Sequence, residues 1–159
     1  TEEENFNIYS DLKILLRHEI ILEVKNKYKN QMRLIGNDWK KYINDAESST
    51  YDIKKIKNIY NGNICLDMGS TLGSLSLYPR SNQIIESGGL ILQCKQVDSD
   101  KIWKNLSKKI NFINQDTLIN LIDSLLNDKI YCDNLLHEIK ENFINSDKDI
   151  ESSLKKVFL

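Results

Sequence analysis

The glycines and the proline of this chain lie almost entirely in one short central region. Five of the six glycines and the only proline fall between Gly62 and Gly89. Glycine and proline interrupt regular secondary structure more strongly than any other residues. Their clustering therefore divides the 159 residues into a helix-rich front, a turn-rich centre and a helix-rich back.

The front, residues 8–60, is predicted to be mainly helical. Residues 8–34 contain no glycine or proline and are expected to form one long helix. Its apolar side chains fall on two sides, with Ile14 and Ile21 opposite a broader apolar face. Such a helix must be covered on two sides, either by the rest of the chain or by another chain. The broader face consists of Leu12, Leu15, Leu16, Ile20 and Leu22.

The centre, residues 63–97, alternates between apolar and polar side chains with a period of two. This pattern is typical of short strands. The alternating runs cover 64–68, 74–78 and 90–95, and turn-forming residues separate them. Strands joined by tight turns predict an antiparallel meander of three or four strands, with a helix over its apolar face.

The back, residues 99–158, is predicted to be helical again. Between Leu118 and Phe143, mainly apolar residues recur at alternating spacings of four and three, which is a heptad-like pattern. One long helix or two shorter ones broken near Asn127-Asp128 would carry it. The positions are Leu118, Ile122, Leu125, Lys129, Cys132, Leu136, Ile139 and Phe143. Together the three regions predict a single α+β domain over residues 1–159.

Composition excludes some classes of partner and site. The net charge of −1 gives no support for a nucleic-acid partner, and charged residues interrupt the densest apolar stretch, so no membrane segment is expected. Three widely spaced cysteines without a CxxC pair favour a reducing compartment, the cytoplasm or the nucleus. His18 and His137 share no ligand spacing with a cysteine, so neither a metal site nor a cofactor is predicted.

One short motif points to cysteine chemistry. The run Asn61-Gly62-Asn63-Ile64-Cys65-Leu66-Asp67 resembles the active-site segment of ubiquitin-conjugating enzymes. The resemblance covers about seven residues, and it implies that Cys65 forms a thioester as the nucleophile. The alternative is a strand in which a small cysteine is half-buried.

Two further resemblances concern the residues that follow. The segment Asp67-x-Gly69-Ser70-Thr71 is similar to the first phosphate loop of actin and sugar-kinase ATPases, in which the backbone cradles phosphate. Those folds need a second such loop, which this chain lacks, so a hairpin turn is the favoured interpretation. The Tyr78-Pro79 pair and the order of elements resemble RWD domains, which are non-catalytic docking modules.

The two apolar helical surfaces give the leading functional expectation. We expect a non-enzymatic scaffold or complex subunit that binds another protein, or itself, through these surfaces. The alternative is that each surface covers the other within a monomer. Two other functions stay open: a cysteine-dependent acyl or thioester enzyme that uses Cys65, and a pathogen-encoded inhibitor or immunity protein. The candidate interface residues are Ile14, Ile21, Leu118, Ile122, Leu125, Leu136 and Ile139.

Overall fold

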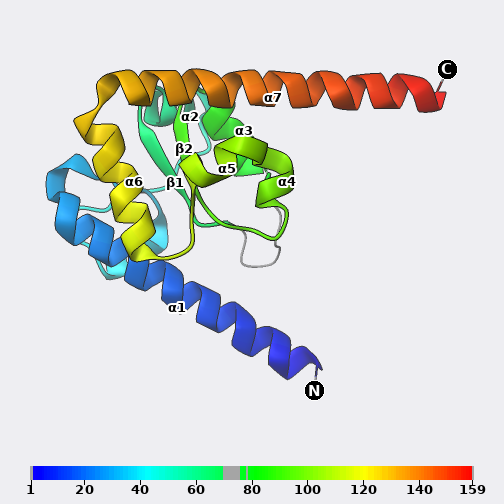
Figure 1. The fold of residues 1–159 in the computed structure, drawn as a ribbon. Coiled ribbons are helices and arrows are strands. Elements are labelled where there is room, and N and C mark those ends of the chain that lie inside the picture. The colour runs from blue at the N-terminus through cyan, green and yellow to red at the C-terminus, as the bar shows by residue number, and fades with distance from the viewer. Residues whose placement is uncertain (1, 70–75, 78, 159) are drawn as a thin grey trace.

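The computed structural model is built around a three-stranded sheet (Figure 1). It describes the backbone of residues 2–69, 76–77 and 79–158, and the side chains of 11–12, 14–69, 76–77 and 79–144. The strands are β1 (Ile64–Asp67), β2 (Leu90–Cys94) and β3 (Asn111–Phe112), in the order β1-β2-β3. Both strand pairs are parallel, and β2 lies between the other two strands.

The predicted antiparallel meander is therefore wrong. A period of two identifies a strand but carries no information about the direction of its neighbour. The first four residues of β2, Leu90 to Gln93, are all buried, as expected for a strand covered on both faces of a parallel sheet. The predicted strand at 74–78 is not confirmed at Ser76 and Leu77, which lie outside the strands, and its other residues lie outside the described part.

Helices make the connections that parallel neighbours require. Helix α3 (Pro79–Glu86) joins β1 to β2 and packs against both strands. Pro79 was predicted to be part of a turn, but a proline is equally suited to the first turn of a helix. Three short helical pieces join β2 to β3, so the predicted helical back is interrupted by a strand. These pieces are α4 (Ser99–Trp103), η3 (Lys104–Leu106) and α5 (Ser107–Ile110).

The front contains one long helix followed by a mostly irregular segment. Helix α1 (Glu2–Tyr28) ends before the predicted limit at residue 34, and Lys29 has a φ of 45°. The short pieces η1 (Lys29–Gln31) and η2 (Asn37–Lys41) follow. Helix α2 (Ile53–Tyr60) then leads into β1.

The back ends in two helices, α6 (Gln115–Asn127) and α7 (Lys129–Phe158). The break falls at Asp128, which matches the second of the two predicted arrangements. Helix α6 contacts α1, β3 and α7, so it joins the two ends of the chain to the sheet. The N-terminal part of α1 and the C-terminal part of α7 extend away from the sheet (Figure 1).

One apolar cluster connects the strands with the helices around them. Its largest fully buried members include Trp103 and Phe112. Long helices contribute to it from both ends of the sequence, with Val24 from α1 and Ile139 from α7. Among the described residues, no helix is long and apolar enough to cross a membrane.

Candidate ligand site at the carboxyl edge of the sheet

A buried carboxylate stands at the carboxyl end of β1. Asp67 is the last residue of this strand and is fully buried. One carboxylate oxygen accepts a hydrogen bond from the backbone N–H of Gly69 at 3.0 Å. The other accepts from the Ser81 hydroxyl at 2.7 Å and from the Gln93 side-chain amide at 3.2 Å. The carboxylate therefore joins β1, the turn that follows it, α3 and β2.

Gln93 extends this network into α4. Its side-chain carbonyl oxygen accepts a hydrogen bond of 3.0 Å from the indole N–H of Trp103. Its amide nitrogen also donates to the backbone carbonyl of Ser76. The Ser76 hydroxyl lies 2.7 Å from that of Ser99, in the first turn of α4. Buried polar groups are stable in a core only when they are hydrogen-bonded, and these groups satisfy one another.

The turn after β1 requires glycine at one position. Gly69 has a φ of +75°, in the left-handed region that other residues avoid. An added Cβ would lie 2.4 Å from the Gln96 side-chain nitrogen. The Gly69 carbonyl oxygen accepts a hydrogen bond of 2.5 Å from Nη2 of Arg17 on α1. The turn is thus held by the sheet through Asp67 and by the long N-terminal helix through Arg17.

Two large apolar side chains are exposed beyond the ends of the other strands. Ile113 follows β3 directly and is 66% exposed, and Val97 follows β2 by three residues and is 84% exposed. The backbone N–H of Lys95 donates to the carbonyl of Phe112 at 2.8 Å, so β2 and β3 stay paired at this edge. In open α/β sheets, ligands bind outside the carboxyl ends of the strands at the point where the strand order reverses. The order β1-β2-β3 of the described strands has no such reversal, so this edge is a candidate site on its residues alone.

The sequence did not identify these residues as a group. Ser81 falls in a segment predicted to be a turn, and Gln93 was assigned to the polar side of an alternating strand. The Asp67–Gln93 contact joins residues 26 apart in the chain and exists only because the two strands are parallel neighbours. The continuous apolar run from Leu90 to Leu92 was the available sign of a strand buried on both faces.

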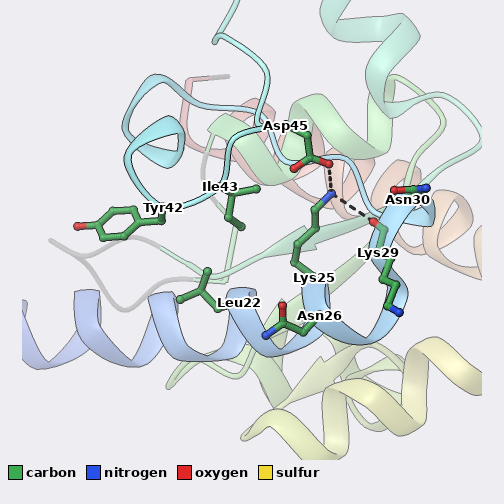
Figure 2. Close-up of a pocket in the computed structure, with 8 residues that line it drawn as sticks. All are labelled: Leu22, Lys25, Asn26, Lys29, Asn30, Tyr42, Ile43 and Asp45. Carbon is green, nitrogen blue, oxygen red and sulfur yellow. Dashed lines mark hydrogen bonds and ion pairs between the residues drawn. The ribbon is translucent and has the colours of Figure 1, made fainter.

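A groove of about 440 Å³ lies between the last turns of α1 and residues 42–45 (Figure 2). Its central cation, Lys25, donates to the carbonyl oxygens of Lys29 at 3.2 Å and Met32 at 2.9 Å, and to the Asp45 carboxylate at 2.8 Å. The hydrogen bond from Lys25 lowers the pKa of the Asp45 carboxyl. These hydrogen bonds hold the end of α1 against residues 42–45. Lys25 therefore has a structural role in the groove.

An aromatic contact holds the same segment to α1. The ring of His18 lies 4.9 Å from the ring of Trp39 and 5.0 Å from that of Tyr42, measured between centroids. Tilted rings at this spacing attract one another. His18 is thus placed in a packing contact with η2.

Most of the predicted interface residues lie inside the chain's own core. On α1 neither predicted face is buried along its whole length, because Ile20 and Ile21, one from each face, are buried while Leu12 and Ile14 are exposed. On α6 the buried positions are covered by the chain itself, because α6 packs against α1, β3 and α7. Ile21, Leu118, Ile122, Leu125 and Ile139 are buried, Leu136 is partly buried, and Ile14 is exposed.

Cys65 does not have the environment of a nucleophile. Its side chain is buried in the middle of β1, and burial raises the pKa of the thiol to about 12. The sulfur lies 3.4 Å from the carbonyl oxygen of Asn63. A nucleophilic cysteine needs an exposed site that favours the thiolate. These observations argue against the predicted thioester chemistry.

We expect Cys65 to resist alkylation in the folded protein. At about pH 7.5 a thiol with a pKa near 12 is almost entirely protonated, and the buried sulfur cannot meet the reagent. Iodoacetamide labelling followed by mass spectrometry should show modification of Cys65 only after denaturant is added. Cys132, which is partly exposed, provides the internal control. Rapid labelling of native Cys65 would restore the thioester hypothesis.

No candidate metal centre is present in the described ranges, where no three histidine, cysteine or acidic residues are grouped to hold an ion. Comparisons with protein-family models, with curated proteins and with solved structures found no match.

Proposed function

We propose that this protein binds a nucleoside-type small molecule at the carboxyl edge of its parallel sheet. The observation that carries the proposal is the buried Asp67 carboxylate, which fixes the turn after β1 through Gly69. Glycine at this place gives the turn the positive φ that it needs, and the turn lies at the carboxyl end of a parallel strand. The proposal concerns binding and assigns no reaction.

Apolar side chains beyond the ends of β2 and β3 also support the proposed ligand site. Val97 and Ile113 present apolar surface to solvent just beyond β2 and β3. Ligand sites combine such apolar surface with a small number of placed polar groups. A nucleoside fits this combination, because its planar base is largely apolar on both faces and its ribose is polar.

Thermal unfolding with adenosine as the probe tests the proposal. A ligand at about 100 times its Kd stabilises a folded protein by about 2.7 kcal/mol. For a chain of this size that corresponds to a rise in Tm of roughly 5–10 °C. We expect such a rise for the wild-type chain, and its loss in Val97→Asp and Ile113→Asp.

A matched variant separates binding from general surface effects. Ile130, at the start of α7, is 76% exposed, so Ile130→Asp makes the same change away from the sheet edge. This variant should keep the full response to adenosine. The proposal is wrong if adenosine has no effect on the wild-type chain, or if Val97→Asp and Ile113→Asp respond like wild type.

A second candidate function, self-association, is favoured by the exposed face of α1. Leu12, Leu15 and Leu16 lie on one side of α1, and each is more than half exposed. Contiguous apolar side chains of this kind are typical of interaction surfaces. We propose that this patch binds a second copy of the chain.

An intracellular setting is also proposed, because the three cysteines remain free thiols.

Light scattering after size exclusion, over a range of concentrations, tests self-association. The wild-type chain should show a mass that rises toward that of a dimer, whereas Leu12→Ser/Leu15→Ser should remain a monomer. Leu126→Ser, which changes an equally exposed leucine on α6, is the control and should behave like wild type. A wild-type monomer at every concentration would exclude this function.

A further inference from the structure

Arg17 reaches the proposed ligand site from α1. Its guanidinium Nη2 donates the hydrogen bond of 2.5 Å to the carbonyl oxygen of Gly69, and the side chain is partly buried. Gly69 lies two residues beyond Asp67, the end of β1. A cation from the front of the chain is therefore placed at the carboxyl edge of the sheet.

The charge of Arg17 has no counter-ion among the described residues. Arg33, by contrast, donates two hydrogen bonds of 2.7 and 2.8 Å to the carboxylate of Glu47. A guanidinium has five N–H donors, and the bond to Gly69 uses one of them. A partly buried cation without an ion pair is favourable for binding an anion, because charge-assisted hydrogen bonds are stronger than neutral ones.

Two carboxylates lie at this edge, Asp67 at the end of β1 and Asp98 beyond the end of β2, and the Asp67 carboxylate belongs to the same turn as Gly69. Left alone, it would repel an anionic ligand. The Asp67 carboxylate is already hydrogen-bonded to Gly69, Ser81 and Gln93. The guanidinium, attached to the same turn, offsets that repulsion.

We infer that Arg17 makes the site selective for a nucleoside that carries an anionic oxygen group, phosphate or carboxylate, over the neutral nucleoside. The inference rests on the proposed function and adds the charge of the ligand to it. Arginine is suited to this task because its planar donors match both phosphate and carboxylate oxygens.

Titration calorimetry with three probes tests the inference: adenosine, adenosine 5′-monophosphate and adenosine 5′-carboxylate. We expect at least one anionic probe to bind the wild-type chain about tenfold more tightly than adenosine. In Arg17→Gln this ratio should fall to about twofold or less, with the Kd for adenosine unchanged. The amide nitrogen of glutamine lies two bonds short of the arginine Nη2, so the unchanged Kd for adenosine is the evidence that the turn keeps its shape without this hydrogen bond.

Two further variants test whether the positive charge of Arg17 causes the preference for an anion, and the two anionic probes distinguish phosphate from carboxylate. Arg17→Lys keeps the charge and should keep part of the preference, and Arg33→Gln should leave the preference intact. Tight binding of the monophosphate alone identifies phosphate as the group that Arg17 selects, and tight binding of the carboxylate alone identifies carboxylate.

The inference is overturned if adenosine binds wild type as tightly as both anions. It is also overturned if Arg17→Gln weakens all three probes equally, since that result assigns Arg17 a purely structural role. Either result leaves the nucleoside site in place. If none of the three probes binds, the proposed function itself is wrong.

Discussion

Replacing Trp103 with alanine is expected to destabilise the protein by about 3–5 kcal/mol. Trp103 is almost completely buried, and its indole N–H donates to the side-chain oxygen of Gln93. Alanine would leave a large cavity beside β2 and an unsatisfied buried oxygen. Urea unfolding monitored by circular dichroism gives the free energy of unfolding directly.

Two controls separate the contributions of Trp103. Trp103→Phe keeps most of the volume but removes the donor, and should cost about 1–2 kcal/mol. Trp39→Ala removes an equally large side chain from the contact with His18 outside the sheet, and should cost less than Trp103→Ala. A loss below about 1 kcal/mol in Trp103→Ala would show that the indole does not support the core.

Gln93→Leu is expected to cost about 2–4 kcal/mol, although leucine is similar in size and more apolar. The change removes the acceptor for Trp103 and a donor to both Asp67 and the Ser76 carbonyl. Buried polar groups left without partners pay the cost of their lost hydration. The free energy of unfolding should therefore fall in spite of the added apolar surface.

The same substitution at the surface is the control for Gln93. Gln83 on α3 is exposed, so Gln83→Leu should change the free energy of unfolding by no more than about 0.5 kcal/mol. Combining Gln93→Leu with Trp103→Phe should cost less than the sum of the two changes, because they remove the same hydrogen bond. Strict additivity would mean that the Gln93–Trp103 bond contributes nothing to stability.

The sequence predicts the helices of this fold better than its sheet. The absence of glycine and proline before Gly36 indicates α1, and the spacing of apolar residues from Leu118 onward indicates α6 and α7. These signals are local. The pairing of Ile64 with Leu90 is not, because alternation within each strand is the same whether the neighbour is parallel or antiparallel.

The candidate site depends on that pairing and was therefore predicted less well. The sequence around Asp67 and Gly69 is similar to a phosphate loop, but that similarity predicts a different position for these residues in the fold. Gln93 and Arg17 carry no local signal, since one meets Asp67 only across two strands and the other meets Gly69 across 52 residues. Side chains that function through tertiary contacts are visible only once the topology is known.

The parallel order of the strands also determines how this chain reaches its native state. Within the described ranges, helical crossovers join both strand pairs, and no hairpin connects neighbouring strands. The pairing of Ile64 with Leu90 joins residues 26 apart in the chain, with α3 between them in sequence. Such non-local contacts slow folding relative to a helical bundle of the same length. The nascent chain therefore cannot form this sheet until both β1 and β2 have been synthesised, and α1 emerges long before the surface that will bury Ile21 and Val24 exists.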